Sequence, residues 1–108
     1  MQLSPPRQAL IRICQETNFG CIKDLMVESG EPVLTTSETV VLIDQKLDMA
    51  EHRSEAALKD FELSGEVVRL MSLFDSITDG KIAKIEIRAG IPRRIIIERS
   101  VSRFRPLA

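Results

Sequence analysis

Hydrophobic positions near the start of the chain recur at the spacing of an amphipathic helix, from Leu10 to Thr17. The preceding Ser4-Pro5-Pro6 is typical of a helix start, because serine accepts a free backbone amide and proline has no amide to leave unpaired. The pattern stops at Asn18-Phe19-Gly20, a sequence that favours a turn. We therefore predict a first helix that begins at Ser4 and ends there.

A β-hairpin is predicted directly after this helix. Residues 21–27 place apolar side chains on one face, which indicates a half-buried strand. Ser29-Gly30 is a candidate hairpin turn, since glycine tolerates the positive φ of a tight connection. Apolar and β-branched residues return at Val33-Leu34 and again over Val40–Ile43. These two runs predict a strand that is interrupted over residues 35–38.

A second amphipathic helix is predicted after Ser64. This serine is a good N-cap, and the apolar positions from Val67 to Ile77 form one helical stripe. Thr78-Asp79-Gly80 ends the pattern. Between the two halves, residues 48–59 contain good helix formers at irregular spacing, so a helix and a long loop both remain open there.

The second helix is followed by another predicted hairpin, with strands over 82–88 and 94–98 joined through Ala89-Gly90. Residues 7–36 align without a gap on residues 67–96. The identical pairs are Leu10 with Leu70, Gly20 with Gly80, Ile22 with Ile82, Gly30 with Gly90, and Pro32 with Pro92. Because glycine permits backbone turns that other residues resist, we interpret the four matched glycines as structural turns.

The alignment predicts an α+β fold built from two αββ repeats. A single hairpin is marginal in water, so the two units are expected to share one antiparallel sheet with both helices packed on one face. The chain has 108 residues, of which 44% are hydrophobic and 29% charged, as expected for one globular domain over 1–108. A basic tail over 99–108 follows the last strand and can be flexible.

Two short motifs resemble small bacterial proteins of uncharacterised function. Asn18-Phe19-Gly20-x-Ile and Ile85-Glu86-Ile87-x-x-Gly-x-Pro are similar to the repeat unit of YezD-like proteins, over about thirty residues per copy. Most of the chain also resembles planctomycete-type hypothetical proteins of similar length. Ile97-Glu98-Arg99 echoes the YezD-like pattern only loosely. Neither resemblance implies catalytic residues, so no function is transferred.

Candidate chemistry is sparse. Cys14 and Cys21 form no CxxC pair and are expected to be buried and reduced, and His52 is the only histidine, so we expect no metal or cofactor. Carboxylates could cluster near strand ends, but dispersed surface acids would give the same list. The acids in question are Glu28, Glu31, Asp44 and Asp48. The chain has no apolar run that could span a bilayer and no signal peptide, so we expect a cytoplasmic protein without membrane contact.

Charge is distributed unevenly. Residues 1–80 hold 7 basic and 14 acidic side chains, whereas residues 81–108 hold 8 and 2. The basic segment either neutralises the acidic part of the same chain or forms an anion-binding sheet face. For nucleic-acid binding, the candidate residues are Lys84, Arg88, Arg94, Arg103, Phe104 and Arg105, with Phe104 able to stack on a base.

The sequence favours a non-enzymatic binding or regulatory module that acts through protein contacts, with another protein or with itself as a homodimer. The alternative is a nucleic-acid-binding regulator that uses the basic C-terminal sheet face. An enzyme with carboxylate chemistry is a distant third hypothesis, because no nucleophile motif or phosphate loop is present.

Overall fold

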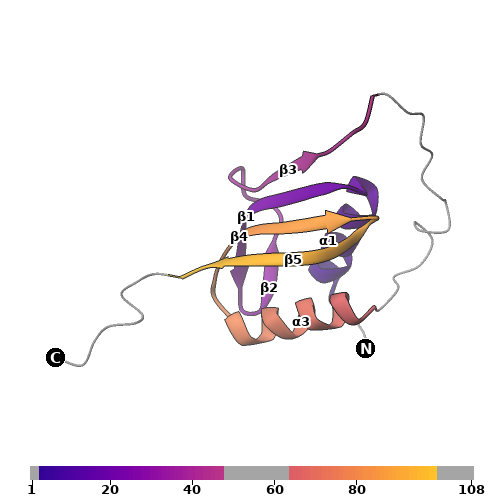
Figure 1. The fold of residues 1–108 in the computed structure, drawn as a ribbon. Helices are drawn as coiled ribbons and strands as arrows, with labels where there is room; N and C mark the ends of the chain where they lie inside the picture. Colours follow the sequence, from indigo (N-terminus) through magenta and orange to yellow (C-terminus); the bar gives the residue numbers. More distant parts are fainter. Residues whose placement is uncertain (1–2, 48–63, 100–108) are drawn as a thin grey trace.

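The computed structural model describes residues 3–47 and 64–99, which form an α+β fold with two helices and one antiparallel sheet of five strands (Figure 1). The segment 48–59 and the tail beyond Arg99 lie outside the described residues. The elements in chain order are α1 (Pro5–Thr17), β1 (Gly20–Glu28), β2 (Glu31–Val33), β3 (Val40–Ile43), α3 (Gly65–Ile77), β4 (Gly80–Arg88) and β5 (Ile91–Glu98).

Both helices begin at the serine that the sequence indicates. The hydroxyls of Ser4 and Ser64 accept the amides three residues further on, at 3.4 and 3.3 Å. At the other end, Asn18 and Thr78 adopt positive φ, of 69° and 56°, as the C-caps. The backbone reversal after each helix therefore falls on a residue with a side chain. The glycines expected to turn the chain there, Gly20 and Gly80, are the first residues of β1 and β4.

The sheet has the order β2-β1-β4-β5, and β3 pairs with β1 on the same side as β2. β2 lies against the end of β1, and β3 lies against its beginning, over Gly20–Lys23. The interruption between the two short strands covers residues 34–39, close to the predicted gap. β1 is irregular at Asp24, which has a φ of 58° and whose carbonyl oxygen accepts the Thr39 hydroxyl at 2.8 Å.

The two hairpin turns have the same backbone conformation. Ser29 and Gly30 have φ of 52° and 76°, and Ala89 and Gly90 have 53° and 77°. Two consecutive positive φ angles are the signature of the type I′ turn, which suits the twist of a two-residue hairpin. β5 begins directly after the second turn, at Ile91, three residues before its predicted start.

One hydrophobic cluster connects both helices with the two central strands. Leu10 and Cys14 of α1, and Leu70 and Phe74 of α3, are almost completely buried in it. The central strands contribute Ile22, Leu25, Val27, Ile82, Ile85 and Ile87. Across the β1–β4 ladder, Ile22 lies opposite Ile85 and Leu25 lies opposite Ile82.

Hydrogen bonds between hairpin turns and helix ends join the two halves of the fold. The Gly30 amide donates to the Thr78 carbonyl at 2.7 Å, and the Gly90 amide donates to the Asn18 carbonyl at 2.9 Å. Each hairpin turn is thus bonded to the end of the helix from the other half. Of the described helices, neither is long and apolar enough to cross a membrane.

Candidate functional site

The strand β3 lies at an edge of the sheet and is apolar along its whole length (Figure 1). Among the described strands it pairs only with β1, so its other side has no strand beside it. Its four side chains are 45%, 37%, 48% and 63% exposed, from Val40 to Ile43. No charged residue or proline interrupts this run. Exposed edge strands of this kind readily accept a further strand.

The direction of the backbone amides in β3 follows from its last bond to β1. The Asp44 amide donates to the Phe19 carbonyl at 2.8 Å. In an antiparallel ladder the backbone polar groups alternate between the two sides of a strand. The amides and carbonyls of Val41 and Ile43 therefore point to the open side, where a new strand would bond.

The opposite edge of the sheet, β5, has the features that natural edge strands use to discourage pairing. It contains Pro92, Arg93, Arg94 and Glu98, and its ladder with β4 has two register shifts. Prolines, charges and bulges at an edge all weaken association with another strand. The edge strand β5 is thus protected against pairing with a further strand, whereas β3 has no proline, charge or bulge to prevent it.

The close approach of β3 to β1 depends on Gly20. This glycine has a φ of 154°, and a Cβ placed on it would collide with the carbonyl oxygen of Leu42. The corresponding position in the second half, Gly80, would place its Cβ 3.1 Å from a methyl group of Ile77. A flexible side chain can shift, whereas a ladder carbonyl cannot, so Gly20 is specifically required for β3 to pair.

Acids lie among the predicted basic residues of the outer sheet face. Lys84 Nζ lies 3.5 Å from Glu86 Oε2, and Arg94 is directly opposite Glu86 in the ladder between β4 and β5. Lys81 lies 3.6 Å from Asp24 and 4.0 Å from Glu98. The described part of the predicted basic face is therefore of mixed charge.

Of the remaining nucleic-acid candidates, Arg88 lies close to Lys84 and Glu86, with which it lines one surface hollow. Arg88 is exposed at the end of β4. Arg103, Phe104 and Arg105 lie outside the described residues, so their use in nucleic-acid binding stays a prediction.

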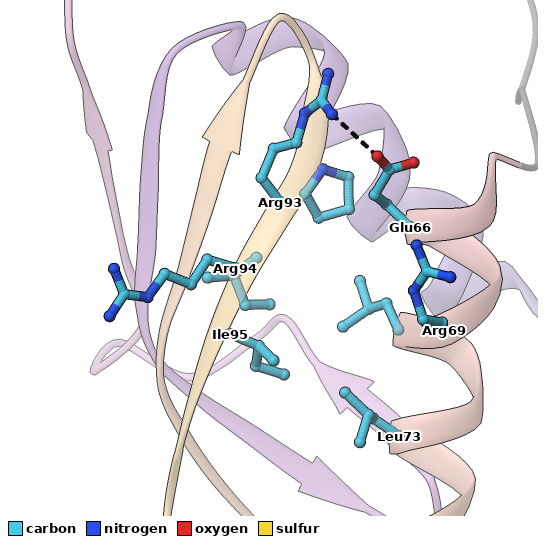
Figure 2. A pocket seen from close by; sticks show the side chains of 9 residues that line it. Glu66, Arg69, Leu73, Arg93, Arg94 and Ile95 are labelled. Atoms are coloured by element: carbon cyan, nitrogen blue, oxygen red, sulfur yellow. Dashed lines mark hydrogen bonds and ion pairs between the residues drawn. The ribbon is translucent and has the colours of Figure 1, made fainter.

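A shallow groove of about 220 Å³ runs between α3 and β5 (Figure 2). Its floor is apolar and includes Leu73 and Ile95. At one end Arg93 Nη1 donates to Glu66 Oε2 at 2.9 Å, while the Arg94 guanidinium points away from the groove. Small-molecule sites are usually at least about 300 Å³. The groove is thus smaller than an ordinary ligand pocket, and an acid already binds one of its cations.

Glu66 is held in its charged form by the start of α3. A hydrogen bond from its own backbone amide lowers the pKa of the Glu66 carboxyl, and Ser64, Arg93 and Arg69 lower it further. Acids in the first helical turn are favoured by the free amides there. This carboxylate therefore serves the helix start.

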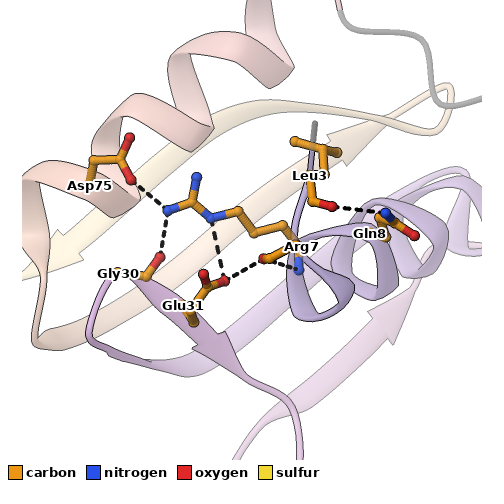
Figure 3. Close-up of polar contacts among 7 residues, drawn as sticks. Leu3, Arg7, Gln8, Gly30, Glu31 and Asp75 are labelled. Atoms are coloured by element: carbon orange, nitrogen blue, oxygen red, sulfur yellow. Dashed lines mark hydrogen bonds and ion pairs between the residues drawn. The ribbon is translucent and has the colours of Figure 1, made fainter. Parts of the chain in front are cut away.

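A half-buried arginine connects the first helix with both halves of the fold (Figure 3). Arg7 Nη2 donates to the Gly30 carbonyl at 2.7 Å and to Asp75 Oδ1 at 2.6 Å, and Nε lies 3.5 Å from Glu31 Oε1. Its guanidinium carbon also lies 5.6 Å from the centre of the Phe74 ring. All of these contacts bind parts of the fold to one another, so Arg7 has a structural role.

The described carboxylates among those considered for catalysis do not converge. Glu28 and Glu31 face each other across the first hairpin, where Glu31 accepts the Ser4 hydroxyl at 2.6 Å. Asp44 lies beyond the other end of β1, next to Phe19. Asp48 and His52 lie outside the described residues. Within the described ranges, no group of three or more His, Cys, Asp or Glu side chains is placed to hold a metal ion.

Cys14 and Cys21 are both buried free thiols. Burial raises the pKa of the Cys14 thiol to about 12, so it is protonated and unreactive at neutral pH. Cys21 lies in β1 directly opposite Leu42. Neither thiol has the exposed, electropositive setting of a catalytic cysteine.

Sequence reasoning found the apolar run of β3 but not its exposure. Every position from Val40 to Ile43 is apolar, without the alternation of a half-buried strand, and such a run is typical of a strand buried on both faces. The structure instead leaves all four side chains exposed. An apolar strand that is exposed to solvent is unusual, and this property identifies the β3 edge as a candidate site.

No protein-family model, curated protein or solved structure matches the chain.

Proposed function

We propose that this protein is a non-enzymatic module that binds another polypeptide by accepting a strand at the open edge of β3. The observation that carries the proposal is the unprotected edge itself, four exposed apolar residues with the backbone groups of Val41 and Ile43 directed away from β1. Added strands gain affinity from main-chain hydrogen bonds and specificity from side chains. The β3 edge offers both.

The charge distribution also supports a protein partner over a nucleic acid. Binding to a polyanion works by neutralising phosphates with clustered cations. On the described outer face, Glu86 lies between Lys84 and Arg94, and Lys81 is near two further acids. Such interleaving lowers the net positive potential that a phosphate backbone would meet.

We further infer that the module consists of two αββ repeats. Each element of the second half begins sixty residues after its counterpart, from α1 and α3 to β2 and β5. The N-caps, the C-caps and the hairpin turns also have matching dihedral angles. The second-half strand continues unbroken, whereas the first-half strand is divided into β2 and β3. On this interpretation, the binding edge arises where the first repeat departs from the second.

A cytoplasmic location fits this function. Cys14 and Cys21 are free thiols, and reducing compartments keep them so.

Hydrogen exchange in dilute solution tests the proposed function without requiring a partner. In the isolated chain, the amides of Val41 and Ile43 should exchange nearly as fast as in an unfolded peptide. The Asp44 amide, which is bonded to Phe19, is the internal control and should be protected. If Val41 and Ile43 are as well protected as Asp44 in the dilute monomer, another part of the chain already covers the edge and the proposal is wrong.

A further inference from the structure

We propose that the strand added at β3 is the β3 strand of a second copy of this chain, paired antiparallel about a two-fold axis that passes through Leu42. The inference rests on the proposed function and names its partner. The result is a continuous sheet across two copies, with the two β3 strands at its centre.

The backbone alternation limits how two copies can pair. Residues that bond across an antiparallel pair must both direct their polar groups to the shared side. In β3 these are Val41 and Ile43, because Asp44 directs its amide to β1. A two-fold pair must therefore place Val41, Leu42 or Ile43 on the axis.

The charged residues that flank β3 favour one of these registers over the others. With Val41 on the axis, Glu38, in the turn before β3, comes to the end of the pair next to Asp44 of the other copy, and neighbouring like charges are destabilising. With Leu42 on the axis, Val40 faces Asp44, and Glu38 comes to the end of the pair where Lys46 of the other copy lies, twice in the dimer. Both registers bring similar numbers of apolar side chains together, so the charged flanks decide for Leu42.

The third register is poorer in apolar contact. With Ile43 on the axis, Leu42 faces Asp44 and Val40 faces Lys46, so apolar side chains meet charged ones. The Leu42 register brings Val41 against Ile43 in both copies and has one apolar–charged pair per copy, Val40 with Asp44, where the Ile43 register has two.

The flanks of β3 also explain why the partner is a second copy. Glu38 precedes the apolar run and Lys46 follows it, and both are exposed. When the strand is reversed against its own copy, Glu38 comes to the end where Lys46 lies, while Asp44 meets Val40. Val41 and Ile43 are likewise matched to their own reversed copy. The strand that β3 is best suited to bind is therefore a second copy of β3.

Analytical ultracentrifugation over a range of about 1 to about 500 μM tests the inference. The full chain should sediment as a monomer and dimer in concentration-dependent equilibrium. Leu42→Lys places two cations on the axis and should raise the dissociation constant at least about 100-fold. Ile96→Lys is the matched control: Ile96 is 41% exposed and lies on the protected edge strand β5, so its dissociation constant should equal that of the unchanged chain.

Charge exchange tests the register and does not depend on Leu42. Glu38→Lys and Lys46→Glu should each weaken the dimer about tenfold, and the double exchange should restore it. A monomer at every concentration would overturn the inference, as would a dimer that Ile96→Lys dissociates and Leu42→Lys does not. Failure of the double exchange to restore the dimer would overturn the register. In each case fast exchange at Val41 and Ile43 in dilute solution would still support an open edge for a different polypeptide, so the two proposals fail separately.

Discussion

The backbone amide of Asp44 donates a 2.8 Å hydrogen bond to the carbonyl oxygen of Phe19. This bond extends the β1–β3 ladder by one pair and fixes which amides of β3 point away from β1. It also places the last apolar residue of the strand, Ile43, with its backbone directed to the open side. The direction of the β3 amides, which this bond sets, determines both whether a strand can be added at the edge and in which registers.

The pairing of β3 should depend on the absence of a side chain at position 20. Gly20→Ala directs a methyl group at the Leu42 carbonyl and forces a residue with a Cβ to adopt a φ of 154°. We expect a loss of more than about 2 kcal/mol of unfolding free energy, together with loss of protection at the Asp44 amide.

Gly80→Ala is the control for this substitution, because it meets only a movable side chain of Ile77. Urea denaturation of both variants gives the comparison. Equal costs for the two variants would show that β3 does not require the close approach at Gly20.

A substitution in the turn of the second hairpin should stabilise the folded protein. Ala89 has a φ of 53°, a conformation that costs a residue with a Cβ roughly 1 kcal/mol and that asparagine tolerates better. Ala89→Asn creates the Asn-Gly pair preferred in type I′ turns and should raise the unfolding free energy by about 0.5 to 1 kcal/mol.

Gly90→Val at the next position should have the opposite effect, since a β-branched residue is strained at a φ of 77°. We expect a loss of more than about 1 kcal/mol. Denaturant midpoints measure both changes, and a neutral Gly90→Val would mean that the turn adopts another conformation in solution.

Arg7 should matter far more for stability than an arginine in an exposed pair. Arg7→Met keeps the apolar stem but loses the bonds to Gly30 and Asp75, and we expect a cost of about 1 to 3 kcal/mol. Arg93→Met removes the bond to Glu66, which lies on the surface, and should cost less than about 1 kcal/mol. Thermal unfolding at low and high salt compares the two. A smaller loss for Arg7→Met than for Arg93→Met would contradict the structural role of Arg7.

The rate at which the buried Cys14 thiol reacts should depend on pH. In a Cys21→Ser variant, which leaves Cys14 as the sole thiol, the rate of reaction with a disulfide reagent should keep rising past pH 9, because the pKa of Cys14 is about 12. In denaturant the rate should be faster and level off near the ordinary thiol pKa. Since the pKa is higher in the folded state, the contribution of this thiol to stability is complete below about pH 9 and is lost as the pH rises toward 12. A plateau near pH 8 in the native protein would contradict this burial.

Much of the local structure could be predicted from the sequence because single residues determine it. Ser4 and Ser64 are capping residues, and Gly30 and Gly90 fall in turns where both central φ angles are positive. These features depend on neighbours in the chain, so their signal is local. The start of β5 was missed because Pro92 and Arg93 are poor strand residues, yet an edge strand tolerates both.

The candidate site could not be predicted in the same way. Whether Val40–Ile43 is buried depends on what lies beside it, and that is decided by the division of the outer strand into β2 and β3 around the irregularity at Asp24. The charge pairs that Lys81 and Lys84 make on the outer face also depend on register across strands, which the sequence left open. Both are tertiary properties that a pattern along the chain does not contain.

Nuclear Overhauser effects between copies would show whether two copies pair through β3 with Leu42 on the axis. A concentrated sample mixed from carbon-13-labelled and unlabelled chains reports only contacts between one copy and the other. We expect an intermolecular contact between the two Leu42 α-protons, because the Cα atoms of such a non-hydrogen-bonded pair lie about 4.5 Å apart. An intermolecular contact between the α-protons of Val40 and Leu42 instead, which pairing about Val41 would give, or intermolecular contacts confined to β5, would contradict this register.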